Sequence, residues 1–319
     1  MRSRPPGGPG PRGARRSIPV LIAILAGAAV AFLAPHAVLW MRPALQPAFA
    51  LTMLAVGTLV RPEQVRIFAQ APLRPLAGLA GQYTIMPLTA GAISLLFEDP
   101  QVRVGIVLVG CMPGAMASNV MTVLLHGDLI LSVTMTTLAT LLSPLVIAFW
   151  LPLLADTRLD VPVGAMAWNA TWMVVLPVAA GIALRGWRRD LSRRWDGTAT
   201  LIASVAIVLI LLVVVAVNRD RLAALGPGLA VAMLSLNLAA YALAFAVATA
   251  MRWPSVQRRT LVVEVGMQNA GLGSVLALAH LGEAGAVPSA FYTVLCLVTV
   301  SLALPFSAGT GRPAGMADR

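Results

Sequence analysis

Ten long apolar runs constrain the fold of this chain more than any other feature of its sequence. A helix needs about 20 apolar residues to cross ~30 Å of hydrocarbon, and runs of that length recur between polar or Pro/Gly-rich breaks. Of the 319 residues, 59% are hydrophobic and only 11% are charged. The pattern predicts an all-α, polytopic membrane protein with ten transmembrane helices, at residues 18–35, 44–60, 72–97, 103–125, 129–154, 161–184, 198–217, 228–250, 260–281 and 286–306.

The arginines predict how these helices are oriented. The chain contains 23 arginines and no lysine. If the N-terminus is cytoplasmic, 18 of the arginines fall in inner segments and five in outer segments. By the positive-inside rule this asymmetry favours a multi-pass protein of the inner (cytoplasmic) membrane with both termini in the cytoplasm. The formal net charge of +11 comes from arginines scattered over short loops, so we expect a lipid bilayer and no nucleic acid as the partner.

Three regions follow from this reading. Residues 1–17 are rich in Pro, Gly and Arg, which is typical of a disordered basic tail. Residues 18–306 are expected to form the transmembrane domain, and residues 307–319 a C-terminal tail. No feature of the sequence indicates an obligate protein partner.

Two of the apolar runs are interrupted near their middle. One reads VLVGCMPGAMASNVMTVLL, residues 107–125, and the other reads LVVEVGMQNAGLGSVLALAHL, residues 261–281. Pro, Gly and amide residues stand where an unbroken helix would be expected. Glu264, in the second run, is the one of twelve acidic residues that falls inside a predicted span. A carboxylate there is costly and normally marks an ion or substrate path.

The interruptions occupy corresponding places in the two halves of the chain. Asn119 and Asn269 are 150 residues apart, each in the fourth span of a five-span half. Because five is odd, the second half must be inverted relative to the first, which predicts two inverted five-helix repeats. Unwound helices inside a protein-lined cavity expose carbonyl oxygens and helix ends to ions and substrates, so the pattern favours a transporter.

These motifs resemble the bile acid:sodium symporter family. The run GCMPGAMASNV, followed by GDLILSVTMTTLATLLSP, is similar to the family's fourth and fifth helices, and VEVGMQNAGL is similar to its ninth. The similarity extends from about Pro47 to Pro305. It implies a panel domain of spans 1, 2, 6 and 7, a core domain of spans 3–5 and 8–10, and interrupted helices 4 and 9 that cross in the core.

The resemblance also implies two sodium sites. Their ligands would be oxygens of hydroxyl, amide, carboxylate and carbonyl groups, which suit Na⁺ as a hard cation. The first site would use Ser118, Asn119, Ser132, Thr136 and Glu264. The second would use Gln82, Glu264, Gln268 and the backbone oxygens of Val265 and Met267.

For the substrate, the resemblance implies contacts at Asn269 and in the last span. Bacterial relatives that bind bile acids tend to have a His-Asn pair there, and the aligned positions in AVPSAFYTVLCLVTVSLAL are Cys296 and Leu297. The substrate is therefore expected to be a small organic anion, either bile-acid-like or a smaller organic acid.

The expected function is sodium-coupled symport of that anion by alternating access. Two Na⁺ around one carboxylate leave about one positive charge, which an organic anion could neutralise. Proton coupling through Glu264 is the alternative. An intramembrane enzyme is not expected, because the spans contain no paired aspartates, no HExxH motif and no Ser-His arrangement.

Overall fold

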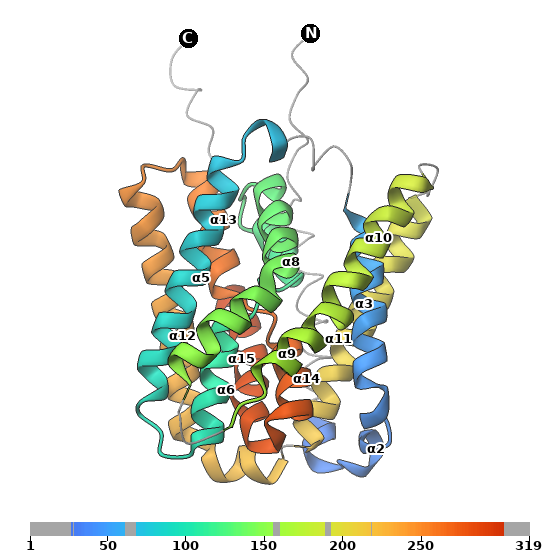
Figure 1. Ribbon diagram of the computed structural model, residues 1–319, viewed down its shortest axis with the longest axis vertical. Helices are drawn as coiled ribbons and strands as arrows, with labels where there is room; N and C mark the ends of the chain where they lie inside the picture. The colour runs from blue at the N-terminus through green and yellow to red at the C-terminus, as the bar shows by residue number, and fades with distance from the viewer. Residues whose placement is uncertain are drawn as a thin grey trace.

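The regular structure of this protein is helical. The computed structural model describes residues 27, 29–60, 68–155, 160–188, 193–217 and 219–302, and within these ranges it contains no β-strand (Figure 1). Four helical segments of this part of the chain are long and apolar enough to cross a membrane, namely Leu129–Leu154, Val163–Trp187, Gly226–Ala250 and Gly282–Leu302. The architecture is that of an all-α membrane protein.

The helices follow the predicted apolar runs from residue 44 onward. Most of the first predicted span, at 18–35, lies outside the described residues, as do both terminal tails. The elements in chain order are α2 (His36–Leu39), η1 (Arg42–Ala44), α3 (Leu45–Leu59), α5 (Leu73–Ser94), α6 (Pro100–Cys111), α7 (Ala117–Leu124), α8 (Leu129–Leu154), α9 (Val163–Ala170), the π-helical turn η2 (Thr171–Val175), α10 (Leu176–Trp187), α11 (Arg193–Val217), α12 (Arg219–Ala250), α13 (Ser255–Gly266), α14 (Ala270–His280) and α15 (Gly282–Leu302).

Both interruptions occur where the sequence predicts them. Helix α6 ends just before Pro113, whose ring is incompatible with a continuing helix, and Met112 is already extended, with φ −72° and ψ 152°. Helix α7 begins at Ala117, after the five residues 112–116 that separate it from α6. Helix α13 ends at Gly266 and α14 begins at Ala270, with the Asn269 side chain accepting a hydrogen bond from the backbone N–H of Leu272 as an N-cap.

The two interruptions lie against each other. Gly114 and Gln268 form an isolated antiparallel bridge. The backbone N–H of Ala115 donates to the Met267 carbonyl at 2.7 Å, and the N–H of Asn269 donates to the Pro113 carbonyl at 2.7 Å. Backbone groups that lose their helical partners in a bilayer need new ones, and each interruption supplies them to the other.

Helix α3 packs against α10 and α11 on one side of the molecule. These three helices stand together at the right of Figure 1, whereas α5, α12 and α13 stand at the left. The contact between α3 and α10 is backbone to backbone at Gly57 and Gly181. A Cβ at Gly57 would overlap the Val178 carbonyl oxygen, and a Cβ at Gly181 would overlap the Leu54 carbonyl oxygen.

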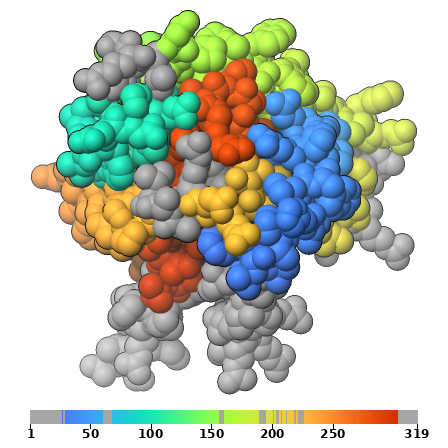
Figure 2. Space-filling model, turned by 90° about the horizontal axis from the view of Figure 1, so that it is seen from below, coloured from blue at the N-terminus to red at the C-terminus, as the bar shows by residue number. Residues whose placement is uncertain are grey.

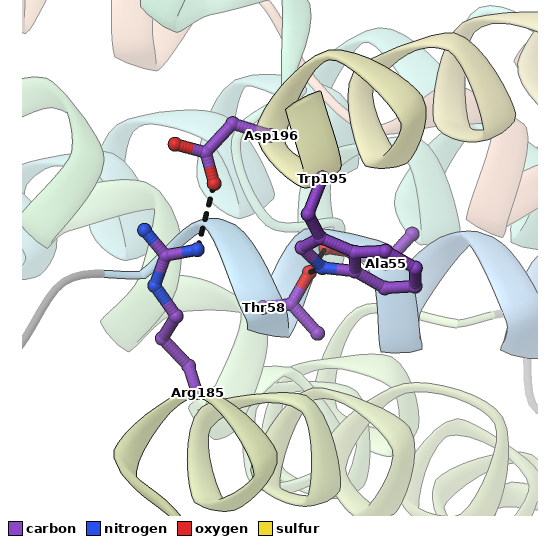
Figure 3. Close-up of polar contacts among 5 residues, drawn as sticks. All are labelled: Ala55, Thr58, Arg185, Trp195 and Asp196. Atoms are coloured by element: carbon purple, nitrogen blue, oxygen red, sulfur yellow. Dashed lines mark hydrogen bonds and ion pairs between the residues drawn. The ribbon is translucent and has the colours of Figure 1, made fainter. Parts of the chain in front are cut away.

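A polar cluster joins the same three helices at their upper ends (Figure 3). The indole N–H of Trp195 donates to Thr58 Oγ1 at 3.0 Å, and the Thr58 hydroxyl donates to the Ala55 carbonyl at 2.6 Å. Arg185 of α10 pairs with Asp196 of α11 at 2.7 Å. The cluster ties α11 to α3 and α10 beyond their apolar contact.

Figure 2 shows the molecule from below, at the end away from this polar cluster. The segment around η1, in blue, adjoins the connection between α14 and α15, in red. Arg42 and Glu283 form an ion pair across this junction at 3.6 Å, with about half of each side chain exposed. An ion pair so accessible to solvent contributes little to stability.

The close approach of α3 and α10 makes a testable prediction. Gly57→Ala would force these helices apart and should lower the midpoint of thermal unfolding of the purified protein, because overpacking typically costs about 1–3 kcal/mol. Gly81→Ala in α5 is the matched control, since no atom lies within 4 Å of a Cβ built there. Equal midpoints for the two variants would contradict the predicted contact.

Candidate ion and substrate site

Glu264 lies at the centre of a cluster of buried hydroxyl groups. Its side chain is completely buried near the end of α13. Ser118 of α7 donates to Glu264 Oε1 at 2.6 Å, and Thr136 of α8 donates to Oε2 at 2.7 Å. The Ser132 hydroxyl of α8 also donates to Oε1. The consecutive helices α7 and α8 therefore meet the distant α13 at one carboxylate.

Local structure explains why these hydroxyls face the carboxylate. Ser132 and Thr136 are four residues apart and so lie on one face of α8. Helix α8 starts at a defined residue because the Asp128 carboxylate accepts hydrogen bonds from the backbone N–H groups of Ile130 and Leu131, both at 3.1 Å. Ser118 lies in the first turn of α7, directly after the interruption.

The cluster contains more acceptor oxygens than hydroxyl hydrogens can satisfy. The Ser132 Oγ atom is 2.9 Å from Asn119 Oδ1 and 3.2 Å from Thr122 Oγ1, in addition to its contact with Glu264. The Ser118 Oγ atom is 2.6 Å from both the Ala115 carbonyl oxygen and Glu264 Oε1. Each hydroxyl carries one hydrogen. An oxygen-rich, buried and negatively charged cluster of this kind suits a hard cation.

Gly114 allows the backbone of the first interruption to approach the carboxylate. A Cβ at this position would lie 2.8 Å from Glu264 Oε2. Any larger residue would therefore displace the carboxylate or the chain that pairs with Gln268. Gly114 therefore leaves space for the Glu264 carboxylate and also lies within the break between α6 and α7.

The second predicted set of ligands also comes together. Gln82 of α5 donates from Nε2 to Gln268 Oε1 at 3.5 Å, and Gln268 Nε2 donates to the Val265 carbonyl at 2.8 Å. The Gln82 Oε1 atom is buried and has no hydrogen-bond partner. The Met267 carbonyl accepts from the Ala115 N–H and keeps a second lone pair. Buried acceptors with spare capacity are what a second cation would need.

A cavity opens between the interruptions and the helices α3 and α11. Its walls are mostly apolar, and its empty volume is about 670 Å³, which includes its opening to solvent. The three predicted substrate contacts, Asn269, Cys296 and Leu297, all line it. The other lining residues are Phe49, Met53, Ala115, Met116, Ala117, Ile210, Val214, Met267, Gln268, Ala270, Gly271, Ser274 and Thr293.

Helices α7 and α14 both begin at this cavity. Among the hydrogen bonds of the described residues, none uses the backbone N–H of Met116, Ala117 or Gly271. Such N–H groups, together with the helix dipole, favour negative charge at a helix N-terminus. The cavity thus combines an apolar wall with two N-termini that can receive an anionic group.

Some residues of the site were missed by the sequence analysis. Thr122 lies four residues after Ser118 and reaches Ser132, and the repeated four-residue spacing of hydroxyls in α7 and α8 could have revealed it. Phe49 and Met53 of α3 carry no local pattern that distinguishes them from other apolar residues of a span. Only their packing assigns them to the cavity.

A helical membrane protein whose interrupted helices enclose a buried carboxylate and a cavity belongs, by architecture, to the class of transporters. Comparison with known proteins agrees. Residues 46–225 match the model of the Sodium Bile acid symporter family. The uncharacterized sodium-dependent transporter YocS of Bacillus subtilis is 32% identical over 272 residues, which cover 85% of each chain.

Plant relatives extend this similarity. The probable chloroplastic sodium/metabolite cotransporter BASS1 of Arabidopsis thaliana is 28% identical over 246 residues, or 76% of this chain and 61% of that protein. The rice BASS1 protein is 29% identical over 288 residues, or 88% of this chain and 70% of that protein. This chain belongs to the sodium bile acid symporter family, which consists of transporters and not enzymes.

The tight fit of Gly114 makes a prediction for the cluster. Gly114→Ala should weaken stabilisation of the purified protein by NaCl, measured as the salt concentration that gives half of the maximal rise in unfolding temperature. A parallel titration with KCl measures the effect of ionic strength alone, which is subtracted. Gly271→Ala is the control, because a Cβ there meets only Asn269 Oδ1, at an ordinary 3.5 Å. The prediction fails if both variants respond to NaCl as the unmodified protein does.

Proposed function

We propose that this protein is a sodium-coupled symporter of an organic anion that works by alternating access. The observation that carries the proposal is the buried Glu264 carboxylate, surrounded by Ser118, Ser132 and Thr136. An isolated buried charge would be strongly unfavourable. Binding of Na⁺ among these oxygens would compensate the charge and use the acceptors that hydroxyl hydrogens leave unsatisfied.

Two sodium ions are proposed. The first is bound by Ser118, Asn119, Ser132, Thr136 and Glu264, and the second by Gln82, Glu264, Gln268 and the carbonyl oxygens of Val265 and Met267. In support, the second group contains the orphaned oxygen of Gln82. The sodium dependence stated in the names of the bacterial and plant relatives supports sodium as the coupling ion.

An organic anion is proposed as the substrate for reasons of charge. Two Na⁺ and one carboxylate leave a net charge of about +1, and no Arg or Lys lines the described cavity. The free N–H groups at the starts of α7 and α14 would bind the anionic group, with Asn269 beside them. Cys296 and Leu297 would contact the body of the substrate. Sodium binding would thereby create the electrostatic conditions for anion binding.

The membrane arrangement is proposed as ten spans in two inverted five-helix repeats within residues 18–306, with residues 1–17 and 307–319 as tails. Helices α3, α10 and α11 would belong to the panel of spans 1, 2, 6 and 7. The core would comprise spans 3–5 and 8–10. In support, the cavity is bounded by α3 and α11 on one side and by the interruptions on the other. Sliding of the core against the panel would expose the cavity alternately to each side of the membrane.

The central prediction concerns Glu264. Glu264→Gln keeps the size of the side chain but removes its charge, so it should abolish stabilisation by NaCl and Na⁺-driven anion uptake. Asn119→Ala removes one amide oxygen and leaves the carboxylate in place. It should lower sodium affinity by about tenfold, for a loss near 1.4 kcal/mol.

The measurement is uptake into proteoliposomes of an anion selected by a stability screen with and without NaCl. Sodium and proton gradients are imposed separately. Uptake that follows the proton gradient at constant Na⁺ would establish the alternative, proton coupling through Glu264. Steep sodium dependence in Glu264→Gln would overturn the proposed role of the carboxylate.

A further prediction tests the orientation, which we propose as inner membrane with cytoplasmic termini. Single cysteines introduced into the 185–196 and 252–259 loops, in a variant without Cys111 and Cys296, should react with an impermeant thiol reagent only from the cytoplasmic side. A cysteine at 156–160 should react from the outside. Reaction of all three from the same side would exclude the inverted repeat.

A further inference from the structure

The carbonyl group of Gly266 is held by two buried side chains. Gly266 is the last residue of α13, two residues after Glu264. Its oxygen accepts hydrogen bonds from Asn237 Nδ2 at 2.7 Å and from the Tyr292 hydroxyl at 2.9 Å. Both lone pairs of the oxygen are therefore used. Unlike the carbonyl groups of Val265 and Met267, this carbonyl group has no capacity left for an ion.

The two donors belong to a larger buried network. The Thr299 hydroxyl donates to Asn237 Oδ1 at 2.6 Å, and Asn237 Nδ2 is also 3.2 Å from the Tyr292 oxygen. Asn237 and Tyr292 are completely buried. Asn237 lies on α12, and Tyr292 and Thr299 lie on α15. We call Asn237, Tyr292 and Thr299 the Gly266 clamp.

The ring of Tyr241 of α12 packs against Gly266 from the side. A Cβ at Gly266 would overlap the Tyr241 ring, so the ring packs directly on the glycine backbone. The Tyr241 hydroxyl is 3.3 Å from Thr299 Oγ1. The end of α13 is thus fixed by hydrogen bonds to its carbonyl and by an aromatic ring against its Cα.

The clamp connects the ion cluster with the cavity. On its α13 side it holds the residue between Val265 and Met267, within one turn of Glu264. On its α15 side, Tyr292 and Thr299 flank Thr293, Cys296 and Leu297, which line the cavity. The end of α13 is therefore tied by hydrogen bonds to the helix that carries part of the cavity wall. The two donors come from two helices, α12 and α15, so both helices fix the end of α13.

We infer that the Gly266 clamp positions the sodium-binding end of α13 and couples it, through α15, to the wall of the substrate cavity. The clamp residues are positioning residues and not ion ligands. This inference rests on the proposed sodium-coupled function. It assigns Asn237, Tyr292 and Thr299 a role in setting sodium affinity.

The test separates positioning from general stability. Thermal unfolding of the purified full-length protein is measured without sodium and across a NaCl titration, with KCl replacing NaCl at constant ionic strength. Tyr292→Phe deletes one hydrogen bond to the Gly266 carbonyl and should raise the NaCl concentration for half-maximal stabilisation by about tenfold. Thr299→Val should raise it less, by a few fold, because Thr299 contacts Asn237 and Tyr241 but not the Gly266 carbonyl itself.

Thr299→Ser keeps the hydroxyl group, so this variant should have the same NaCl midpoint as the unmodified protein. Thr89→Val is the matched control, because the Thr89 hydroxyl donates to the Ile85 carbonyl of the same helix, α5, and does not reach the clamp. If Tyr292→Phe does not yield folded protein, the two Thr299 variants provide the same comparison.

The outcomes distinguish this inference from the proposed function. A lower unfolding temperature with an unchanged NaCl midpoint in Tyr292→Phe and Thr299→Val would overturn the clamp, while a sodium response lost in Glu264→Gln would leave the proposed function intact. Absence of any NaCl effect on the unmodified protein would overturn both. A raised midpoint in the clamp variants, with rescue by Thr299→Ser, supports the inference.

Discussion

Two backbone hydrogen bonds between the interrupted helices hold the site together. The Ala115 N–H donates to the Met267 carbonyl, and the Asn269 N–H donates to the Pro113 carbonyl. Lipid offers no partner for a backbone group, so neither interruption could persist there alone. Paired, they allow four half-helices to end in the interior of the protein. The candidate ion site and the helix N-termini that we propose for anion binding both depend on those ends.

Glu264 gives this arrangement its chemical character. The carboxylate is buried among hydroxyl groups, which stabilise its charge less than a cation would. A protein that needed only tight packing would have no reason to bury a charge in this way. In the proposed function the same logic connects ion and substrate, since the charge of bound cations would reach a cavity whose described lining contains no Arg or Lys. The end of α13 carries Glu264 and leads directly into Met267, which lines the cavity, and this is why we infer a role for the Gly266 clamp.

Glycines mark the places where this architecture tolerates no side chain. Gly57 and Gly181 bring α3 and α10 into backbone contact, Gly114 admits the carboxylate, and Gly266 accepts the Tyr241 ring. Gly81, by contrast, faces open space. The composition of the chain alone cannot separate these roles, because each depends on a residue from a distant helix.

The sequence alone determined the class of fold, the apolar centres of the described helices from residue 44 onward and both interruptions, because apolar length, Pro113 and the glycines act locally. It did not fix every helix start, since α12 begins at Arg219 and not at residue 228. It also singled out Glu264, since a charge in a span is conspicuous in any fold. Only the tertiary structure decided which side chains share a site. The pairing of Gly114 with Gln268, the contact of Thr122 with Ser132, and the role of Asn237, which as a lone polar residue in a span carries no local pattern, depend on how the helices pack. Packing is a property of distant segments, and no local pattern encodes it.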